Sequence, residues 1–378
     1  MNFIIVEVFF KCCSSFCQQI KNSGGMISPF FVAIFFLGLS SLVTAINFTL
    51  VYEWPDEWDY EWPSEANRTQ ARRDGSFKPE YLEARYMAVY GSRIFLSLKK
   101  NDGVPVSLVS FPTSSATSAP PKLTPFPSLD IHLNESEKCN MINRAEGLQV
   151  DSVGRLWVLD WGNSLFNCSA KLWIVNLNNN ETELIHQFSF TGQMHDLVID
   201  ETPNGTFAYI ARWSDVNIVV FSLERNESWI VDTPGVEVLS IAMSPKVERR
   251  QLYLGELYSD ELYSISVAAL RNGTRTANPE FIGKWTGTPY RMLVDNHGTL
   301  FAAILSENYA SSWNTSQPFK EQRFHEVAEL DYVWSFTFAL DQNGTLWMTE
   351  FDKAKTPKLR IVKESLECSG SCPKNGTA

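Results

Sequence analysis

Pairs of short apolar stretches joined by a tight turn recur along the chain. In residues 144–162, RAEGLQVDSVGRLWVLDWG, one alternating run ends at Val150 and a second begins at Leu156. Alternation with a period of two is typical of a β-strand that buries one face. Asp151 and Gly154 stand between the runs, and these residue types favour the positive φ and local hydrogen bonds of a tight turn. The segment therefore predicts a β-hairpin.

The same pattern returns further along the chain. Residues 292–305 (MLVDNHGTLFAAIL) and 338–351 (FALDQNGTLWMTEF) repeat it closely, and residues 197–211 repeat it with a longer turn. Residues 86–98 and 241–257 keep the flanking strands and lose part of the turn. An aromatic residue follows each turn, at intervals of 62, 52, 44, 48 and 46 residues: Phe95, Trp157, Tyr209, Tyr253, Phe301 and Trp347.

These intervals lie close to the roughly 40–50 residues of a β-propeller blade. A helical solenoid is disfavoured, because no sustained 3.6-residue period appears between the hairpins. A single hairpin cannot bury its own face, and six such units that close into a ring leave no long exposed edge. The sequence therefore predicts an all-β fold, a six-bladed β-propeller over residues 46–366, followed by a short tail of residues 367–378.

The strongest apolar block, residues 27–46, has the features of a targeting segment. It follows Met26 and reaches the small-residue pattern V-T-A, which is typical of cleavage by signal peptidase after Ala45. We interpret residues 26–45 as a signal peptide and residues 1–25 as an upstream extension. A signal anchor is the alternative, because about 20 apolar residues can span a bilayer. Cleavage is favoured, and it predicts a secreted, extracellular protein with no stable membrane association.

Asparagine sequons support secretion independently. Eleven N-x-S/T sequons occur, several of them in predicted turns, and N-G-T is also favourable turn chemistry. Turn chemistry alone does not explain eleven, although Asn167 is doubtful because Cys168 is its middle residue. We expect glycosylation at Asn47, Asn67, Asn134, Asn180, Asn204, Asn226, Asn272, Asn314, Asn343 and Asn375.

Four of the seven cysteines remain when residues 1–45 are removed, and four cysteines allow three pairings. Cys139 and Cys168 flank the hairpin of residues 144–162, so a bridge between them would fix the loop that enters this blade. Cys368 and Cys372 are expected to close a small C-terminal loop. A zinc site is the alternative, but secretion and the absence of neighbouring histidines disfavour it. We expect no metal.

Charge and motifs exclude several classes of function. The net charge is −11 and the basic residues are scattered, whereas a nucleic-acid-binding protein needs a basic face. An acidic protein favours a cation or an amine as its ligand. The motifs G-x-S-x-G, H-E-x-x-H, G-x-G-x-x-G and the P-loop are all missing, so we expect no cofactor.

Six motifs in order resemble the yellow/major royal jelly protein family of arthropods, over roughly residues 50–362. They are Trp62-Pro63, NDGVPVSLVSFP (101–112), the block of residues 144–162, AKLWIVNL (170–177), HDLVID (195–200) and SENYASSWNTSQPF (306–319). The resemblance implies a secreted six-bladed propeller whose role differs among members. These roles include binding of biogenic amines, a part in melanin pigmentation with dopachrome conversion, and nutritive secretion. The chain departs from the family pattern at Glu146, where Trp is common, and it lacks a second cysteine pair in the later blades.

Ligand sites of propellers lie at the mouth of the central channel, and the run before each turn should form the innermost strand. Apart from Leu239, the opening residues of these runs are polar or aromatic: Glu146, His195, Asp196, Leu239, Ser240, Tyr290, Arg291, Trp334 and Ser335. Each can have a structural role, such as Asp196 capping a turn or Trp334 packing. Convergence of several polar groups in a concave site is nevertheless the usual mark of binding.

For the amine-binding relatives, the resemblance implies a hydroxyl residue before the last inner strand and an amide after the strand that follows. These positions are Ser335 and Glu350 here. A carboxylate at Glu350 can meet an ammonium through a charge-assisted bond. We therefore expect binding of a small aromatic amine or catechol, with Trp334 or Tyr290 as a flat wall.

Three other functions stay open. A dopachrome-converting isomerase would use His195 and Asp196 for acid/base chemistry, and the same residues with Glu146 could instead serve a metal-dependent lactonase. The remaining alternative is a structural or storage secretory protein.

Cleavage of the signal peptide gives the first testable expectation. Protein secreted from insect cells should begin at Ile46 or within a few residues of it, as measured by N-terminal sequencing. A secreted N-terminus before Met26 would contradict this interpretation, and an uncleaved membrane-bound form would support the signal anchor.

Overall fold

The computed structural model describes residues 48–55, 57–115, 119–133, 139–190, 194–245, 249–328 and 330–366. The chain divides into two compact units, Met1–Ala45 and Ile46–Ala378, and all described residues belong to the second. No helix among them is long and apolar enough to cross a membrane. Several predictions lie outside the described residues: the signal peptide, the Cys368–Cys372 loop, and the sequons at Asn47, Asn134 and Asn375.

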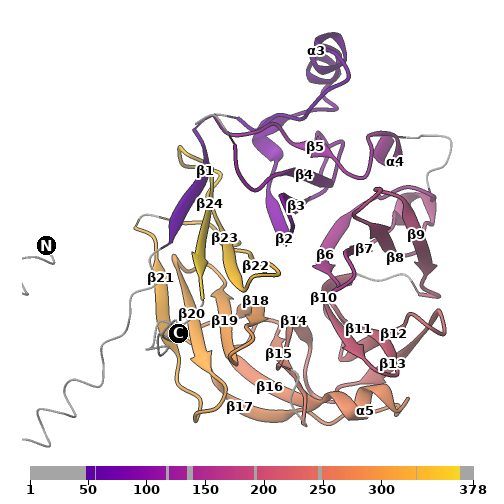
Figure 1. Ribbon diagram of the computed structural model, residues 1–378, viewed down its shortest axis with the longest axis vertical. Coiled ribbons are helices and arrows are strands. Elements are labelled where there is room, and N and C mark those ends of the chain that lie inside the picture. Colours follow the sequence, from indigo (N-terminus) through magenta and orange to yellow (C-terminus); the bar gives the residue numbers. More distant parts are fainter. Residues whose placement is uncertain are drawn as a thin grey trace, which may run out of the picture. The chain divides into compact units, whose positions relative to one another are not determined.

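Six four-stranded antiparallel sheets form a ring, so the prediction of an all-β, six-bladed propeller is confirmed (Figure 1). Five blades run from the inner to the outer strand in chain order. The first contains β2 (Ala84–Tyr90), β3 (Arg93–Leu98), β4 (Leu108–Pro112) and β5 (Thr124–Pro125). The second contains β6 (Ala145–Val150), β7 (Arg155–Asp160), β8 (Lys171–Asn176) and β9 (Thr182–Gln187). The third contains β10 (Met194–Thr202), β11 (Gly205–Arg212), β12 (Asn217–Ser222) and β13 (Glu227–Asp232).

The fourth blade contains β14 (Val238–Met243), β15 (Gln251–Glu256), β16 (Glu261–Ser266) and β17 (Glu280–Lys284). The fifth contains β18 (Pro289–Val294), β19 (Thr299–Ile304), β20 (Tyr309–Asn314) and β21 (Gln322–Glu326). The last contains β22 (Phe338–Leu340), β23 (Thr345–Phe351), β24 (Leu359–Ser365) and β1 (Thr49–Trp54). Short helices lie between strands: α3 (Glu65–Asp74), α4 (Asp130–Leu133), α5 (Val267–Arg271), and the 3-10 helices η1 (Pro79–Tyr81) and η3 (Ser164–Phe166).

A buried aspartate explains the repeating hairpin. Asp151 Oδ1 accepts hydrogen bonds from the backbone N–H groups of Val153 (3.2 Å) and Arg155 (2.9 Å). Its Oδ2 accepts from the Trp157 indole at 2.9 Å. Gly154 closes the turn with a φ of 84°, a left-handed conformation that suits glycine. One carboxylate thus fixes both the turn and the first large side chain of the next strand.

The last blade repeats this arrangement. Asp341 accepts from the N–H groups of Asn343 and Thr345 and from the Trp347 indole, each at 2.9 Å. Gly344 again has a positive φ, 75°. The six aromatic residues chosen from the sequence all lie on the second strand of their blades, namely β3, β7, β11, β15, β19 and β23. The interval between them therefore measures one blade.

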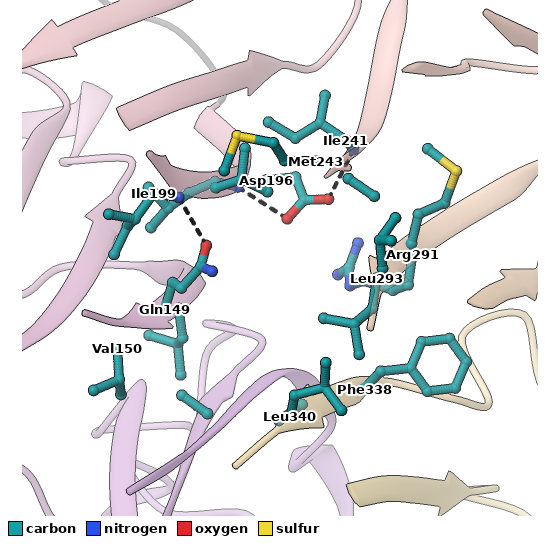
Figure 2. A pocket seen from close by; sticks show the side chains of 18 of the residues that line it. Gln149, Val150, Asp196, Ile199, Ile241, Met243, Arg291, Leu293, Phe338 and Leu340 are labelled. Atoms are coloured by element: carbon teal, nitrogen blue, oxygen red, sulfur yellow. Dashed lines mark hydrogen bonds between the residues drawn. The ribbon is translucent and has the colours of Figure 1, made fainter. Parts of the chain in front are cut away.

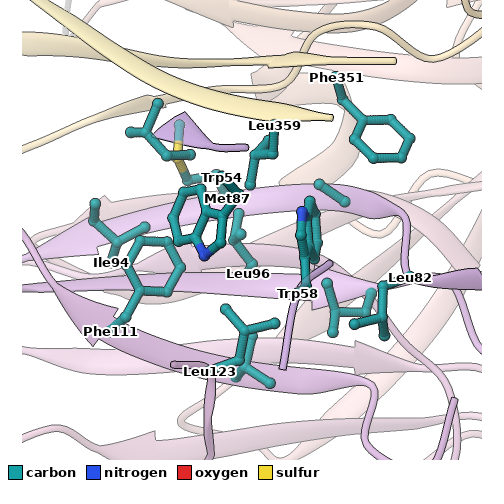
Figure 3. Close-up of a cluster of buried hydrophobic side chains, with 14 of the residues drawn as sticks. Trp54, Trp58, Leu82, Met87, Ile94, Leu96, Phe111, Leu123, Phe351 and Leu359 are labelled. Carbon is teal, nitrogen blue, oxygen red and sulfur yellow. The ribbon is translucent and has the colours of Figure 1, made fainter. Parts of the chain in front are cut away.

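The N-terminal strand β1 closes the ring. It pairs antiparallel with β24, so the last blade takes its outermost strand from the start of the propeller (Figure 1). Trp54 and Trp58 pack beside this closure: Trp54 lies 5.5 Å from Phe111 of the first blade, and Trp58 lies 5.7 Å from Phe351 of the last, between ring centroids (Figure 3). Sequence analysis placed residue 46 at the start of the propeller but did not identify this strand.

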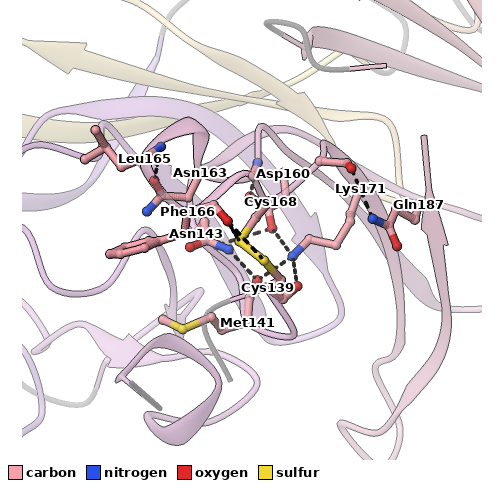
Figure 4. The surroundings of a disulfide bond; sticks show 12 residues. Cys139, Met141, Asn143, Asp160, Asn163, Leu165, Phe166, Cys168, Lys171 and Gln187 are labelled. Atoms are coloured by element: carbon pink, nitrogen blue, oxygen red, sulfur yellow. Dashed lines mark hydrogen bonds and ion pairs between the residues drawn. A yellow bond between two sulfur atoms is a disulfide. The ribbon is translucent and has the colours of Figure 1, made fainter. Parts of the chain in front are cut away.

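A disulfide joins Cys139 to Cys168, as the sequence predicted (Figure 4). The two cysteines are 29 residues apart, and closing a loop of this length stabilises a fold by roughly 3–4 kcal/mol in the chain-entropy model. Lys171 strengthens the same region, because its Nζ donates to the carbonyl oxygens of Cys139 (2.6 Å) and Met141 (2.9 Å). The loop that enters the second blade is therefore fixed to the loop between β7 and β8.

Replacing the hairpin carboxylate should destabilise the propeller. Asp151→Ala leaves the fully buried Trp157 indole and two backbone N–H groups without their acceptor, and should lower the free energy of unfolding by roughly 2–4 kcal/mol. Asp102→Ala is the control, since Asp102 is exposed, and it should change stability by less than about 0.5 kcal/mol. Urea unfolding followed by tryptophan fluorescence measures both. Equal midpoints for the two variants would contradict this role of Asp151.

Candidate functional site

The six inner strands enclose a cavity of about 640 Å³ at the centre of the ring (Figure 2). Its lining comes from the second halves of β2, β6, β10, β14, β18 and β22, and from the residues that follow them. The cavity therefore lies toward the end of the channel where the inner hairpins turn. Apolar side chains, including Val150, Met243, Leu293, Phe338 and Leu340, lie in its wall beside polar and charged ones such as Glu201, Arg250 and Asp295.

Asp196 is one of two charged residues at the inner end of this cavity, which is the end farther from the turns of the inner hairpins. Its side chain is 7% exposed, and its oxygens accept the backbone N–H groups of Leu197 (2.9 Å) and Ile241 (3.1 Å). Burial raises the pKa of Asp196 to about 6, although Arg291 and the two N–H donors act in the opposite direction. This carboxyl group therefore titrates close to neutral pH.

Arg291 is the second. Its Nε and Nη2 donate to the carbonyl oxygen of Arg85, both at 3.2 Å, and its Nη1 donates to the carbonyl oxygen of Tyr290 at 2.7 Å. The guanidinium carbon lies 3.4 Å from the ring centroid of Tyr86. Among the described residues, Arg291 and Asp196 form no ion pair within 4.0 Å, although both line the cavity. Figure 2 shows both groups directed toward the same open space.

A buried layer lies beyond this pair, at the opening residues of the inner strands. Glu146 is 3% exposed, and its Oε2 lies 3.6 Å from the Nε of Arg85. Burial raises the pKa of Glu146, and the neighbouring arginines lower it. Trp334 covers Arg85, whose guanidinium carbon is 4.3 Å from the indole centroid. None of these three side chains lines the cavity.

His195 is fully buried in the same layer. Its Nδ1 lies 2.8 Å from the carbonyl oxygen of Leu239 and 3.0 Å from the hydroxyl of Tyr86. Because a carbonyl can only accept, we assign the proton to Nδ1. The Nε2 has no hydrogen-bond partner among the described residues, and the ring contacts Trp213 at 5.1 Å. Burial lowers the pKa of His195 well below its ordinary value, so the imidazole is neutral.

Three other predicted residues have bonding partners inside the protein. The Tyr290 hydroxyl donates to the carbonyl oxygen of Phe336 (2.9 Å) and accepts from the Phe336 N–H (2.7 Å). Ser335 Oγ donates to the carbonyl oxygen of Tyr332 at 2.6 Å. Ser240 Oγ donates to the carbonyl oxygen of Pro289. These bonds connect strands and loops, and none of them faces the cavity.

Glu350 lies apart from the cavity, on β23. Its Oε1 is 2.8 Å from Nε2 of His325 on β21, and its Oε2 is 3.8 Å from Nη1 of Arg360 on β24. The carboxylate therefore already has partners within the chain. Ser335 and Glu350 do not meet at the cavity, and of the residues predicted from the sequence only Asp196 and Arg291 line it.

Sequence reasoning missed the later residues of the inner strands. Gln149 lines the cavity, and its Oε1 accepts the N–H of Ile199 at 3.0 Å. Met243 and Leu293 supply flexible apolar walls opposite. The alternating pattern marks them as strand residues, but it does not indicate at which depth the channel is open. No group of three His, Cys, Asp or Glu residues in the described part of the chain could hold a metal ion.

Solved structures with a similar arrangement share little sequence with this chain. A luciferin-regenerating enzyme aligns with a TM-score of 0.48 and 11% identity, covering 78% of this chain and 93% of its own. A streptogramin B lyase aligns with a TM-score of 0.46 and 10% identity, covering 74% and 78%.

Sequence comparison gives a firmer relationship. Protein yellow of Drosophila guanche is 25% identical over 346 residues, and that of Drosophila melanogaster 24% over 348. Each alignment covers 79% of this chain, but only 60% and 63% of the relative, so the chain spans less than two thirds of these proteins. The family model described as major royal jelly protein matches residues 145–238 and 233–353, more than half of the chain. The chain belongs to the major royal jelly protein family.

Proposed function

We propose that this protein binds a small aromatic ligand, a biogenic amine or a catechol, in the central cavity. The observation that supports the proposal is that Asp196 and Arg291 both line a cavity of about 640 Å³ without forming an ion pair with each other. Small-molecule sites typically have volumes of about 300–1,000 Å³, apolar walls and a few polar groups that set orientation. The volume of the cavity lies in this range, and its wall combines apolar side chains with polar and charged ones.

The two charged groups retain hydrogen-bonding capacity. Asp196 accepts two backbone N–H bonds, and a carboxylate has about four acceptor positions. Arg291 donates three bonds from its five N–H groups. A catechol hydroxyl can donate to Asp196 and accept from Arg291, while an ammonium can bind only Asp196. A ligand with both a donor and an acceptor therefore fits this pair better than a simple cation.

We also propose that the protein acts outside the cell. Family membership and the sequons support this. The seven predicted glycosylation sites within the described residues all have exposed asparagines: Asn67, Asn180, Asn204, Asn226, Asn272, Asn314 and Asn343. Exposure leaves space for a glycan at each site.

A dopachrome isomerase is the second candidate, and one observation favours it. Asp196 lines the cavity with a pKa of about 6, which suits a group that accepts and returns a proton near neutral pH. His195 lies behind this residue, neutral and away from the cavity. If the protein converts dopachrome, Asp196 and not His195 should act as the base.

Replacing Asp196 tests the binding proposal. Asp196→Asn should weaken dopamine binding by roughly ten- to a hundredfold in calorimetric titration, because a charge-assisted bond contributes about 1.5–3 kcal/mol. Met243→Trp should block the cavity without removing a hydrogen bond, and it covers the case in which Asp196→Asn misfolds. Glu350→Gln is the matched carboxylate variant outside the cavity and should bind like the parent. If only Glu350→Gln weakens dopamine binding, the ligand site lies in the Ser335–Glu350 region instead. If the parent protein binds no amine or catechol, a storage role is favoured.

The pH dependence provides an independent check. Dopamine affinity should rise about fivefold between pH 5 and 6, and by a further factor of about two above pH 6, as Asp196 ionises. Stability should respond in the opposite direction: the unfolded carboxyl loses its proton near pH 3.8 and the folded one near pH 6, so this group destabilises the fold as pH rises between these values. Asp196→Asn should remove both effects. A flat affinity profile in the parent protein would exclude Asp196 as the ammonium partner.

A further inference from the structure

A second cavity, here called the loop pocket, lies beside the disulfide and has a volume of about 480 Å³. Three segments line it: residues 100–102 after β3, residues 132 and 141–144 before β6, and residues 163–166 between β7 and β8. Because consecutive strands of a blade are antiparallel, these loops lie at the end of the blades opposite to the turns of the inner hairpins. The loop pocket shares no lining residue with the central cavity.

The disulfide gives the loop pocket a defined shape. Cys139 belongs to the segment before β6 and Cys168 to the loop between β7 and β8, so the bond joins two of the three walls (Figure 4). Asn163 Oδ1 also caps η3 by accepting the N–H of Leu165 at 3.1 Å. The walls are therefore held by covalent and hydrogen bonds.

Two basic side chains, Lys100 and Arg144, line this pocket together with the exposed carboxylate of Asp102. Lys100 Nζ donates to the carbonyl oxygen of Pro105 at 2.7 Å, and neither Lys100 nor Arg144 has a carboxylate within 4.0 Å among the described residues. Burial, with a contribution from the positive Arg144, lowers the pKa of Lys100 to about 8, and Asp102 acts in the opposite direction. Two like charges in one partly desolvated pocket repel each other, and an anion between them would remove this repulsion.

Arg144 is fixed by its backbone, while its guanidinium keeps free donors. Its N–H donates to Asp160 Oδ1 (2.9 Å), and its carbonyl oxygen accepts from the Trp161 N–H (3.1 Å). The guanidinium lies over the Trp161 ring, 4.6 Å from the centroid, and its buried Nε has no acceptor among the described residues. His132 adds no charge, because burial lowers its pKa to about 4.

The rim of the pocket is apolar. Leu165 is 88% exposed and Phe166 is 48% exposed, both on η3. Large apolar side chains at such exposure beside a polar pocket are typical of a binding edge. A ligand that fits here has an acidic group for the interior and a flat apolar part for the rim.

We propose that the loop pocket binds a small aromatic carboxylate, held between Lys100 and Arg144 with its ring against η3. The proposal rests on no residue of the central cavity, so it stands or fails independently of the proposed function. A carboxylate would accept charge-assisted bonds from Nζ of Lys100 and from the guanidinium of Arg144.

Titration of the full-length secreted protein with benzoate tests this, with benzamide as the uncharged probe of the same shape. Benzoate should bind at least tenfold more tightly than benzamide in calorimetry and should change the fluorescence of Trp161, which lies under Arg144. Its affinity should fall as pH rises through about 8, where Lys100 loses its charge. Equal binding of the two probes, or no binding of benzoate at millimolar concentration, would overturn the proposal.

Variants locate the site. Lys100→Met and Arg144→Gln should each weaken benzoate binding by ten- to a hundredfold. Lys99→Met is the matched control, because Lys99 lies outside the pocket and pairs with Glu83 at 3.1 Å. Circular dichroism confirms folding, and since two independent variants are used, failure of one to fold leaves the other informative. Benzoate binding that persists in both folded variants, or that dopamine displaces competitively, would also overturn the proposal.

Discussion

Closure of the ring by β1 is the constraint on which the remaining structure depends. Each blade buries its faces only against its neighbours, so the first and last blades need each other. The antiparallel pairing of β1 with β24 supplies a main-chain connection, and Trp54 and Trp58 fill the space beside it with buried aromatic surface. A channel with defined walls exists only in the closed ring. The central cavity is therefore a consequence of a pairing between strands that lie about 300 residues apart in sequence.

The side chains that line or surround the channel differ in chemical character along its length. The opening residues of the inner strands bury Glu146, Arg85 and His195. Glu146 and Arg85 form an ion pair at 3.6 Å, whereas Nε2 of His195 has no hydrogen-bond partner among the described residues. Leaving such an atom unsatisfied costs about 1–3 kcal/mol, and an internal water can offset part of this. This buried layer lies at the opening residues of the inner strands, and the cavity lies at their later residues.

Features that depend on contacts between residues close together in the sequence could be predicted from it. Features that depend on contacts between distant segments were missed. The blade period was readable because Asp151 and Asp341 bind residues two, four and six positions ahead, and this spacing is visible in the chain. The disulfide was readable because Cys139 and Cys168 flank one predicted hairpin. The strand β1 was missed because its partner is far away. The open depth of the channel was missed because burial of His195 depends on Trp213 and Trp334, which other segments contribute.

Backbone contacts hold Asp196 and Arg291 apart, although both line the same cavity. In water, or on a flexible loop, a carboxylate and a guanidinium would be free to form a direct pair. Here the carboxylate is held by two backbone N–H groups, and the guanidinium by two backbone carbonyl groups. Neither group can therefore move toward the other without breaking these hydrogen bonds to the backbone. A ligand that bridges them finds both groups already oriented, and little of its binding energy is lost in ordering side chains.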